Sequence, residues 1–407
     1  MLYNLITGEL VLSQHFDESD ISKFRNQYEE EFNELVEKRY LVPMDFDEYK
    51  TVKQLRKIVH QVENQREGII GYTIMPTSHC NARCFYCFEA GYPHTHMSEE
   101  TADQLVDYMV NHCNEEKFLN ITWFGGEPTV GHKRIDQICK GLQENGINYS
   151  SFMYSNGYLF DDEMVKRAVD LWKLNKIQIT LDGTEDVYNK AKAYKSAQGS
   201  PYYRVLDNIK RLLDAGIYVM IRLNMDFYNS KDLEKLIKEL SIKLQGYTNI
   251  SVYVSILFED EGFEKVKHTN EEKLELETEK ERLETIIRNY KLKRLEQTPM
   301  PNLRSISCCA DNDASLLINP KGDIAKCDHF PDDLIFGNIQ SNTFDHERYK
   351  EIKKPKEFDL CKTCKLYPTC YSLGICTSSD SCNEIRIKFK TSGLLNNMMI
   401  LYSGKSV

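Results

Sequence analysis

Residues 71–89 read GYTIMPTSHCNARCFYCFE, a β-rich string that leads into a loop with cysteines at positions 80, 84 and 87. Three cysteines this close can bind three irons of a 4Fe–4S cube and leave the fourth iron open to an outside ligand. A structural zinc site is the alternative interpretation. Zinc requires four ligands, however, and His79 is poorly placed as the fourth because it directly precedes Cys80. The loop therefore favours a redox cluster with an open iron.

The same string is the first of six that alternate with amphipathic stretches up to about residue 258: GYTIMP, NITWF, SSFMY, KIQITL, YVMIRLN and ISVYVSI. Ser98 is a predicted N-cap before one helical stretch, and Gly216 is a predicted stop signal after another. This repetition predicts an α/β fold with a parallel sheet and right-handed crossovers, a partial (β/α)6 TIM-like barrel. The reactive centre is expected in the loops at the carboxyl ends of the strands.

Other segments flank the predicted barrel at 68–258. Residues 1–67 include an acidic helical stretch with one apolar face formed by Phe24, Phe32, Leu35 and Val36. They form either a small winged-helix-like module or a simple cap. Residues 259–303 are strongly charged with a thin apolar stripe, which predicts a surface linker helix. Residues 304–407 contain eight of the thirteen cysteines, and metal is expected to stabilise them.

The bulk composition limits the functional class. With 407 residues the chain exceeds one ordinary domain, and 41% hydrophobic with 28% charged residues is typical of a globular protein. No apolar run has the length of a membrane span and the start has no secretory pattern, so no membrane contact and a cytoplasmic location are expected. A formal charge of −10 disfavours nucleic acid as a partner. The cysteines then indicate metal ligands, apart from Cys113 and Cys139, which are expected to be buried on helices.

Short motifs follow three of the later predicted strands, Gly125-Gly126-Glu127-Pro128, Ser155-Asn156-Gly157 and Leu181-Asp182-Gly183, and a fourth motif, Arg222-Leu223-Asn224, lies on the fifth strand. The Asn-Gly and Asp-Gly dipeptides alone are ordinary turns, and Arg222 can equally form a salt bridge at the core edge. In this order after the CxxxCxxC run they resemble the radical SAM superfamily, in which the open iron binds S-adenosylmethionine (SAM). The resemblance implies a catalytic cluster on Cys80, Cys84 and Cys87. It also implies SAM-binding roles, with Glu127 facing the SAM ammonium, for Tyr86, Gly125, Gly126, Glu127, Ser155, Asn156, Asp182 and Arg222.

The C-terminal cysteines form a second pattern, Cys309 and Cys327 followed by Cys361-x2-Cys364-x5-Cys370-x5-Cys376-x5-Cys382. It resembles the SPASM domain, which holds two auxiliary 4Fe–4S clusters. The resemblance implies one cluster on Cys309, Cys327 and Cys376, and another on Cys361, Cys364, Cys370 and Cys382. The family usually has three residues where five separate Cys370 from Cys376, so the role of Cys376 stays open. Either Cys308 completes the first cluster or one iron is open to a substrate thiolate; two structural zinc sites are the alternative.

The whole arrangement resembles maturases of ribosomally synthesised, post-translationally modified peptides (RiPPs), with residues 1–67 as a candidate module for precursor-peptide recognition. The resemblance implies an oxygen-sensitive oxidoreductase that uses SAM and three 4Fe–4S clusters. Its expected partners are a precursor peptide and a reductant such as flavodoxin or ferredoxin. An open auxiliary iron favours thioether formation on a peptide cysteine. The runner-up is an anaerobic sulfatase-maturating enzyme, which makes formylglycine, and a rival of another class is a zinc-stabilised binding protein.

Overall fold

The computed structural model describes residues 1–63, 68–257, 268–293, 302–303, 309–327, 334–354, 357–370 and 384–404. The chain divides into two compact units. One unit contains residues 1–65, 298–311 and 353–407, and the other contains residues 66–297 and 312–352. The cysteine-rich end of the chain therefore contributes to both units.

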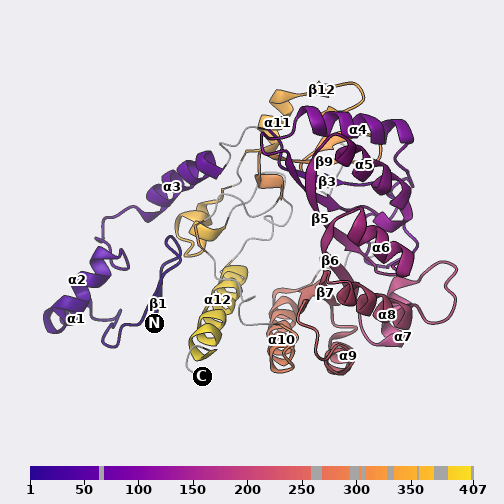
Figure 1. Ribbon diagram of the computed structural model, residues 1–407. Coiled ribbons are helices and arrows are strands. Elements are labelled where there is room, and N and C mark those ends of the chain that lie inside the picture. Colours follow the sequence, from indigo (N-terminus) through magenta and orange to yellow (C-terminus); the bar gives the residue numbers. More distant parts are fainter. Residues whose placement is uncertain are drawn as a thin grey trace. The chain divides into compact units, whose positions relative to one another are not determined.

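The larger unit is built on the parallel sheet that the sequence predicts. Strands β3 to β8 lie in chain order, each parallel to the next (Figure 1). Their bounds are β3 Gly71–Ile74, β4 Phe118–Trp123, β5 Asn148–Ser155, β6 Leu174–Leu181, β7 Tyr218–Met225 and β8 Ile250–Ile256. All six predicted strands and the partial (β/α)6 barrel are confirmed. The carboxyl ends of the strands consequently meet at one edge, where the predicted motifs lie.

Helices follow the strands and bury one face each. They are α4 Glu99–Asn111, α5 His132–Glu144, α6 Asp162–Asp170, α7 Glu185–Lys192, α8 Pro201–Asp214 and α9 Ser230–Lys243. In Figure 1, α4, α5, α6 and α8 lie on the same side of the strands. The Ser98 hydroxyl accepts a hydrogen bond from Thr101 N over 3.0 Å, which confirms the predicted N-cap of α4. Gly216 follows α8 with a φ of 82°, a conformation that glycine adopts readily.

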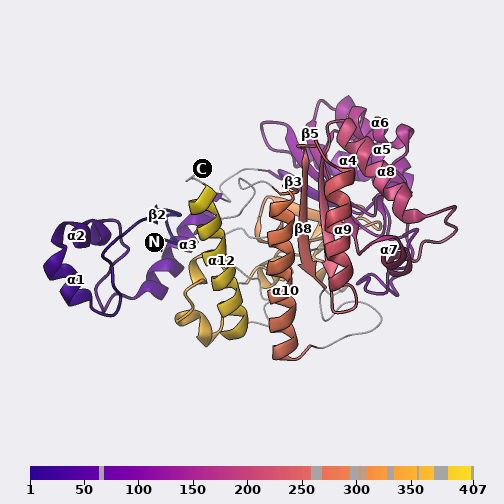
Figure 2. The ribbon, with the colours of Figure 1, turned by 90° about the horizontal axis from the view of Figure 1, so that it is seen from below.

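The charged stretch beyond the sixth strand forms α10 (Asn270–Asn289), which packs against β8 and α9. Figure 2 shows α9 and α10 beside β8. The thin apolar stripe that the sequence predicts is fully buried, at Leu276, Leu283 and Ile287. The helix therefore covers the edge of the barrel beside β8.

The segment after residue 312 extends the barrel sheet, which the sequence does not predict. Strand β9 (Ser315–Ile318) pairs in parallel with β3, and β10 (Asp323–Ala325), β11 (Gly337–Asn338) and β12 (Thr343–Phe344) follow in antiparallel order. Helix α11 (His346–Ile352) comes next. Met75 at the end of β3 packs with Leu317 and Ala325, so apolar contacts join the extension to the barrel.

The smaller unit begins with the ribbon of β1 (Leu2–Tyr3) and β2 (Leu10–Val11) and the helices α1 (Ile21–Gln27), α2 (Glu29–Glu37) and α3 (Glu48–Glu63). It ends with α12 (Glu384–Gly404). The predicted single apolar face is wrong for Val36, which is 44% exposed, and the stretch forms two helices that are separated at Tyr28. Phe24 and Leu35 are buried as expected. Among the described helices, none combines the length and apolar character needed to cross a membrane.

The two isolated cysteines differ from one another. Cys139 is buried on α5, as predicted. Cys113 is half-buried and lies beyond the end of α4, because the helix stops at Asn111 and the chain then forms a short bridge to Ile69. The prediction of a helical, buried Cys113 is therefore wrong.

Candidate functional site

The loop that leaves the carboxyl end of β3 carries Cys80, Cys84 and Cys87. Main-chain hydrogen bonds with the last residue of α7 and with the segment after it hold this loop. Arg83 N donates to Lys192 O over 2.8 Å, and Lys195 N donates to Asn81 O over 2.9 Å. The three thiols consequently belong to a loop that is fixed at two points.

The next motif, after β4, packs directly against the cysteine loop. Gly126 N donates to Thr77 O over 3.2 Å, and Glu127 N donates to His79 O over 3.0 Å. A Cβ atom on Gly125 would lie 2.3 Å from Thr77 O, and one on Gly126 would lie 2.7 Å from His79 O. Gly125 also has a φ of 116°. Only glycine fits at both positions, because any side chain would separate the two loops.

The Glu127 carboxylate is buried, with 1% of the residue exposed, and it joins the β4 and β5 ends. Its Oε1 accepts hydrogen bonds from Thr129 N (3.2 Å), Thr129 Oγ1 (2.5 Å) and Ser155 Oγ (2.8 Å). Its Oε2 accepts from Asn156 N over 2.7 Å. Burial raises the pKa of Glu127, and these hydrogen bonds offset the rise only in part. The carboxylate is thus a link between two predicted SAM-binding motifs.

Asn156 connects this link to the first cysteine. Its Nδ2 donates to Asn81 Oδ1 over 2.7 Å and lies 3.9 Å from Cys80 Sγ. The Ala82 N–H also points at Cys80 Sγ, at 3.4 Å. Hydrogen bonds to cluster-bound sulfurs are one of the means by which proteins tune such sites.

A buried chain of polar groups lies on the other side of the cysteine loop. Lys192 Nζ donates to the Tyr86 hydroxyl over 2.8 Å, and this hydroxyl donates to Asp182 Oδ1 over 2.7 Å. The ammonium also lies 3.2 Å from Asp182 Oδ2, as an ion pair without hydrogen-bond geometry. Burial alone lowers the pKa of Lys192, but Asp182 and Cys84 together raise it above its ordinary value. The sequence does not single out Lys192, since nothing in NKAKAYK distinguishes a buried lysine from a surface one.

The ends of β6 and β7 complete the group. Asn229 Nδ2 donates to the carbonyl oxygens of Asp182 (2.7 Å) and Asn224 (2.8 Å), and Asn224 Oδ1 accepts from Arg222 Nε over 2.8 Å. Asn229, which directly precedes α9, is buried and was also missed by sequence analysis. The structure therefore brings the predicted residues of β3, β4 and β5 into one network, and those of β6 and β7 into an adjoining one that includes Tyr86.

The chemistry of the cysteine loop fits an iron–sulfur cluster. Burial raises the pKa of Cys80 to about 12 and that of Cys87 to about 11, so iron is needed to favour the thiolate form. Within the described part of the chain, no three His, Cys, Asp or Glu side chains are grouped to hold a single metal ion. A cube differs from zinc in this respect, because each of its irons takes its own thiolate.

The C-terminal cysteines are distributed over both units. Cys327 follows β10 in the larger unit and is half-buried. Cys361, Cys364 and Cys370 belong to one short segment of the smaller unit, where Phe358 N points at Cys361 Sγ over 3.4 Å. Cys308, Cys376 and Cys382 lie outside the described residues, and so does the side chain of Cys309. The predicted ligand sets therefore stay predictions.

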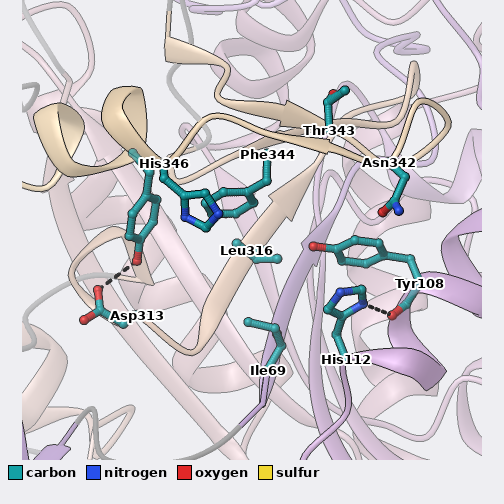
Figure 3. A pocket seen from close by; sticks show the side chains of 10 residues that line it. Ile69, Tyr108, His112, Asp313, Leu316, Asn342, Thr343, Phe344 and His346 are labelled. Carbon is teal, nitrogen blue, oxygen red and sulfur yellow. Dashed lines mark hydrogen bonds between the residues drawn. The ribbon is translucent and has the colours of Figure 1, made fainter.

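A separate pocket of about 320 Å³ opens near the amino end of β3. Figure 3 shows Tyr108 and His112 on one side of it and Phe344 and His346 on the other. Its remaining lining residues are Ile69, Asp313, Leu316, Asn342, Thr343 and Tyr349. None of the predicted site residues is among them, so this pocket is distinct from the cysteine loop.

The fold and site define a class, a partial β/α barrel with a three-cysteine loop and a network of polar groups at the carboxyl ends of its strands. Residues 74–240 match the radical SAM superfamily, and residues 308–365 match an iron–sulfur cluster-binding domain named SPASM. The chain therefore contains a radical SAM domain and an iron–sulfur cluster-binding SPASM domain, and both predicted domains are confirmed. These two domains indicate an enzyme with SAM and iron–sulfur clusters as its cofactors.

Similar proteins extend this comparison. The chain is 23% identical over 290 residues to the antilisterial bacteriocin subtilosin biosynthesis protein AlbA of Bacillus subtilis, a match that covers 68% of the chain and 57% of AlbA. It is 25% identical over 163 residues to an uncharacterised protein of Methanocaldococcus jannaschii, covering 40% of the chain and 52% of that protein. The chain thus spans little more than half the length of these relatives.

Solved structures have the same fold. The anSMEcpe structure with bound AdoMet and the Kp18Cys peptide has a TM-score of 0.64 and 14% identity, over 83% of this chain and 99% of that one. Streptococcus suis SuiB bound to its precursor peptide SuiA has a TM-score of 0.53 and 15% identity, over 87% of this chain and 84% of SuiB.

Proposed function

We propose that this enzyme abstracts a hydrogen atom from a ribosomally made precursor peptide and installs a thioether or similar cross-link in the cytoplasm. The observation that carries the proposal is the network around the cysteine loop in a chain that also has a SPASM domain. Similarity to AlbA, a bacteriocin biosynthesis protein, and to SuiB, solved with a precursor peptide, supports a peptide as the substrate.

In this proposal the chain's own residues bind and orient SAM. Cys80, Cys84 and Cys87 hold the cluster, which together with bound SAM supplies a 5'-deoxyadenosyl radical on reduction. Glu127 accepts from the SAM ammonium while Ser155 and Asn156 keep its carboxylate in place.

The remaining predicted residues would contact other parts of bound SAM. Tyr86 and Asp182 lie in one hydrogen-bonded group, which would hold the Tyr86 ring in place beside the cofactor. Arg222, oriented by Asn224, provides a guanidinium for the SAM carboxylate. Gly125 and Gly126 let the β4 loop approach both the cysteine loop and the cofactor.

The SPASM domain is proposed to hold two auxiliary clusters, for three in total. Residues 1–67 are proposed as the peptide-recognition module, ahead of the barrel at 68–258, the linker at 259–303 and the SPASM domain at 304–407. A flavodoxin or ferredoxin is the proposed electron donor, since one electron must reach the cluster in each SAM cleavage. A reducing cytoplasm suits this cysteine-rich chain.

The test uses anaerobically reconstituted enzyme, dithionite, SAM and the small peptides encoded beside its gene. We expect formation of 5'-deoxyadenosine that rises with one of these peptides, and a mass change in that peptide alone. SAM cleavage that none of the peptides affects, with every peptide unmodified, would show that the substrate is of another class.

A further inference from the structure

The ion pair of Lys192 and Asp182 is buried to an unusual degree for charged side chains. Their exposed side-chain fractions are 5% and 0%. Placing two charges in such an environment is expensive, and exchange for apolar residues is often neutral or stabilising, so the pair needs a reason other than stability. The nearest candidate reason is the cysteine loop, because Tyr86 lies between Cys84 and Cys87 in sequence and bonds to both charges.

The main chain keeps the ammonium in this position. Lys192 is the last residue of α7, and its carbonyl oxygen accepts from Arg83 N within the cysteine loop itself. Ala193 then adopts a left-handed conformation, with a φ of 43°, and the chain returns to pair with Asn81. The Lys192 Nζ also lies 5.4 Å from the centre of the Tyr86 ring, as a cation–π contact. A displacement of Lys192 would thus also displace the cysteine loop.

We propose that the buried Lys192–Asp182 pair sets the reduction potential of the cluster on Cys80, Cys84 and Cys87, with Lys192 raising it and Asp182 lowering it. The inference rests on the proposed assignment of that cluster to these three cysteines. Reduction adds one electron from a flavodoxin- or ferredoxin-type donor to the cluster. A nearby positive charge stabilises the added negative charge, and a nearby carboxylate does the opposite, more strongly in a buried site than in water. Lys192 and Asp182 are thus positioning residues that act through the cluster.

The test is an EPR-monitored redox titration of the anaerobic holoenzyme without SAM. The signal of this cluster is identified as the one that a Cys80→Ala/Cys84→Ala/Cys87→Ala variant lacks. Lys192→Met should lower the reduced-to-oxidised ratio at a fixed potential about tenfold, equal to a midpoint shift of about 59 mV for one electron. Asp182→Asn should shift the midpoint in the opposite direction. Tyr86→Phe, which removes the bridging hydroxyl but no charge, should leave it nearly unchanged.

Midpoint shifts of opposite sign distinguish this inference from general damage to the site. A loosened loop does not explain why the midpoint potentials of Lys192→Met and Asp182→Asn would shift in opposite directions. Shifts of the same sign in both charge variants, or no shift in either, would overturn the role of the pair. If the triple cysteine variant instead keeps every EPR signal, the proposed cluster assignment fails. Lys192→Arg serves as the conservative control and should retain a midpoint closer to wild type than that of Lys192→Met.

Discussion

The main-chain N–H of Asn156 donates to the Glu127 carboxylate over 2.7 Å, and so joins the turn after β4 to the turn after β5. Four donors from three residues converge on this one buried side chain. Glu127 therefore has two tasks in our proposal, since it accepts from SAM and also keeps two SAM-binding loops at a fixed separation.

Glu127→Gln tests both tasks. The Gln amide has the same shape as the carboxylate, but its NH2 group must face at least one of the donors that contact a carboxylate oxygen in the wild type. A charge-assisted hydrogen bond of about 1.5–3 kcal/mol is also lost. We expect the Kd for SAM, measured by equilibrium binding to the reconstituted enzyme, to rise about tenfold or more, with slower SAM cleavage. Glu163→Gln, at an exposed position of α6, is the matched control. An unchanged SAM affinity in Glu127→Gln would remove Glu127 from the SAM site.

The cluster assignment at the cysteine loop is tested by Cys80→Ala/Cys84→Ala/Cys87→Ala. With three 4Fe–4S clusters, iron should fall from about 12 to about 8 per chain, and 5'-deoxyadenosine formation should stop while the auxiliary clusters remain. Iron analysis and chromatography of the nucleoside measure the two effects. Cys113→Ala, at a half-buried cysteine outside both patterns, should keep all the iron. Stoichiometric zinc without iron in the wild type would favour the binding-protein alternative.

The strand pattern and the turns could be predicted because they depend on local sequence. Ser98 as a cap and the β-rich string at 71–74 are examples, each fixed by its immediate neighbours. Lys192 could not be found in this way. Its burial depends on Tyr86 and Asp182, which come from other parts of the chain, and its own neighbours are ordinary helix residues.

The sheet extension was missed for a related reason. The β9 string SLLI is short, and its pairing with β3 joins residues more than 240 positions apart in the chain. The break at Tyr28 was missed because no Gly or Pro marks it in the sequence, although Tyr28 has a φ of −136° and separates α1 from α2. Secondary-structure propensity and hydrophobic periodicity thus predicted the helices and strands, whereas contacts between distant parts of the chain determined which side chains lie together.

Glu357 connects α3 to the segment of Cys361, Cys364 and Cys370. Burial raises its pKa, but hydrogen bonds from Lys53, Tyr367 and Tyr49 lower it overall below the ordinary 4.5. A lowered pKa adds stability above the unfolded-state value, and this stability is lost as the pH falls through the folded-state value. We expect Glu357→Gln to release auxiliary iron to a chelator faster than wild type at pH 7, with the difference shrinking below about pH 4.5. The control is Glu351→Gln, whose exposed pair with Arg348 contributes little. Equal release rates in Glu357→Gln and wild type at pH 7 would contradict this role.

In our proposal, the first auxiliary cluster has either an open iron or Cys308 as a fourth ligand. If the iron is open, Cys308→Ala should leave cluster content and turnover nearly intact, whereas Cys309→Ala or Cys327→Ala should lose both. Mössbauer spectra and iron content of each variant decide between the two arrangements. Loss of the cluster in Cys308→Ala alone would mean that the site is closed, and direct binding of a substrate thiolate would then be excluded.

The peptide product distinguishes the chemistries that this fold supports. Formation of a thioether removes two hydrogens, so each cross-link should lower the peptide mass by about 2 Da and make one cysteine resistant to alkylation. Both effects are measured by mass spectrometry before and after iodoacetamide treatment, with the Cys80→Ala/Cys84→Ala/Cys87→Ala enzyme as the control that leaves the peptide unchanged. Oxidation of a Cys or Ser to formylglycine would instead give an aldehyde that reacts with hydrazides. A peptide that loses about 2 Da, keeps every cysteine open to alkylation and does not react with hydrazides would carry a cross-link without sulfur. That result would refute thioether formation, since no peptide thiolate would then bind to the SPASM domain. It would leave peptide maturation in place, because the radical step needs only a hydrogen to abstract.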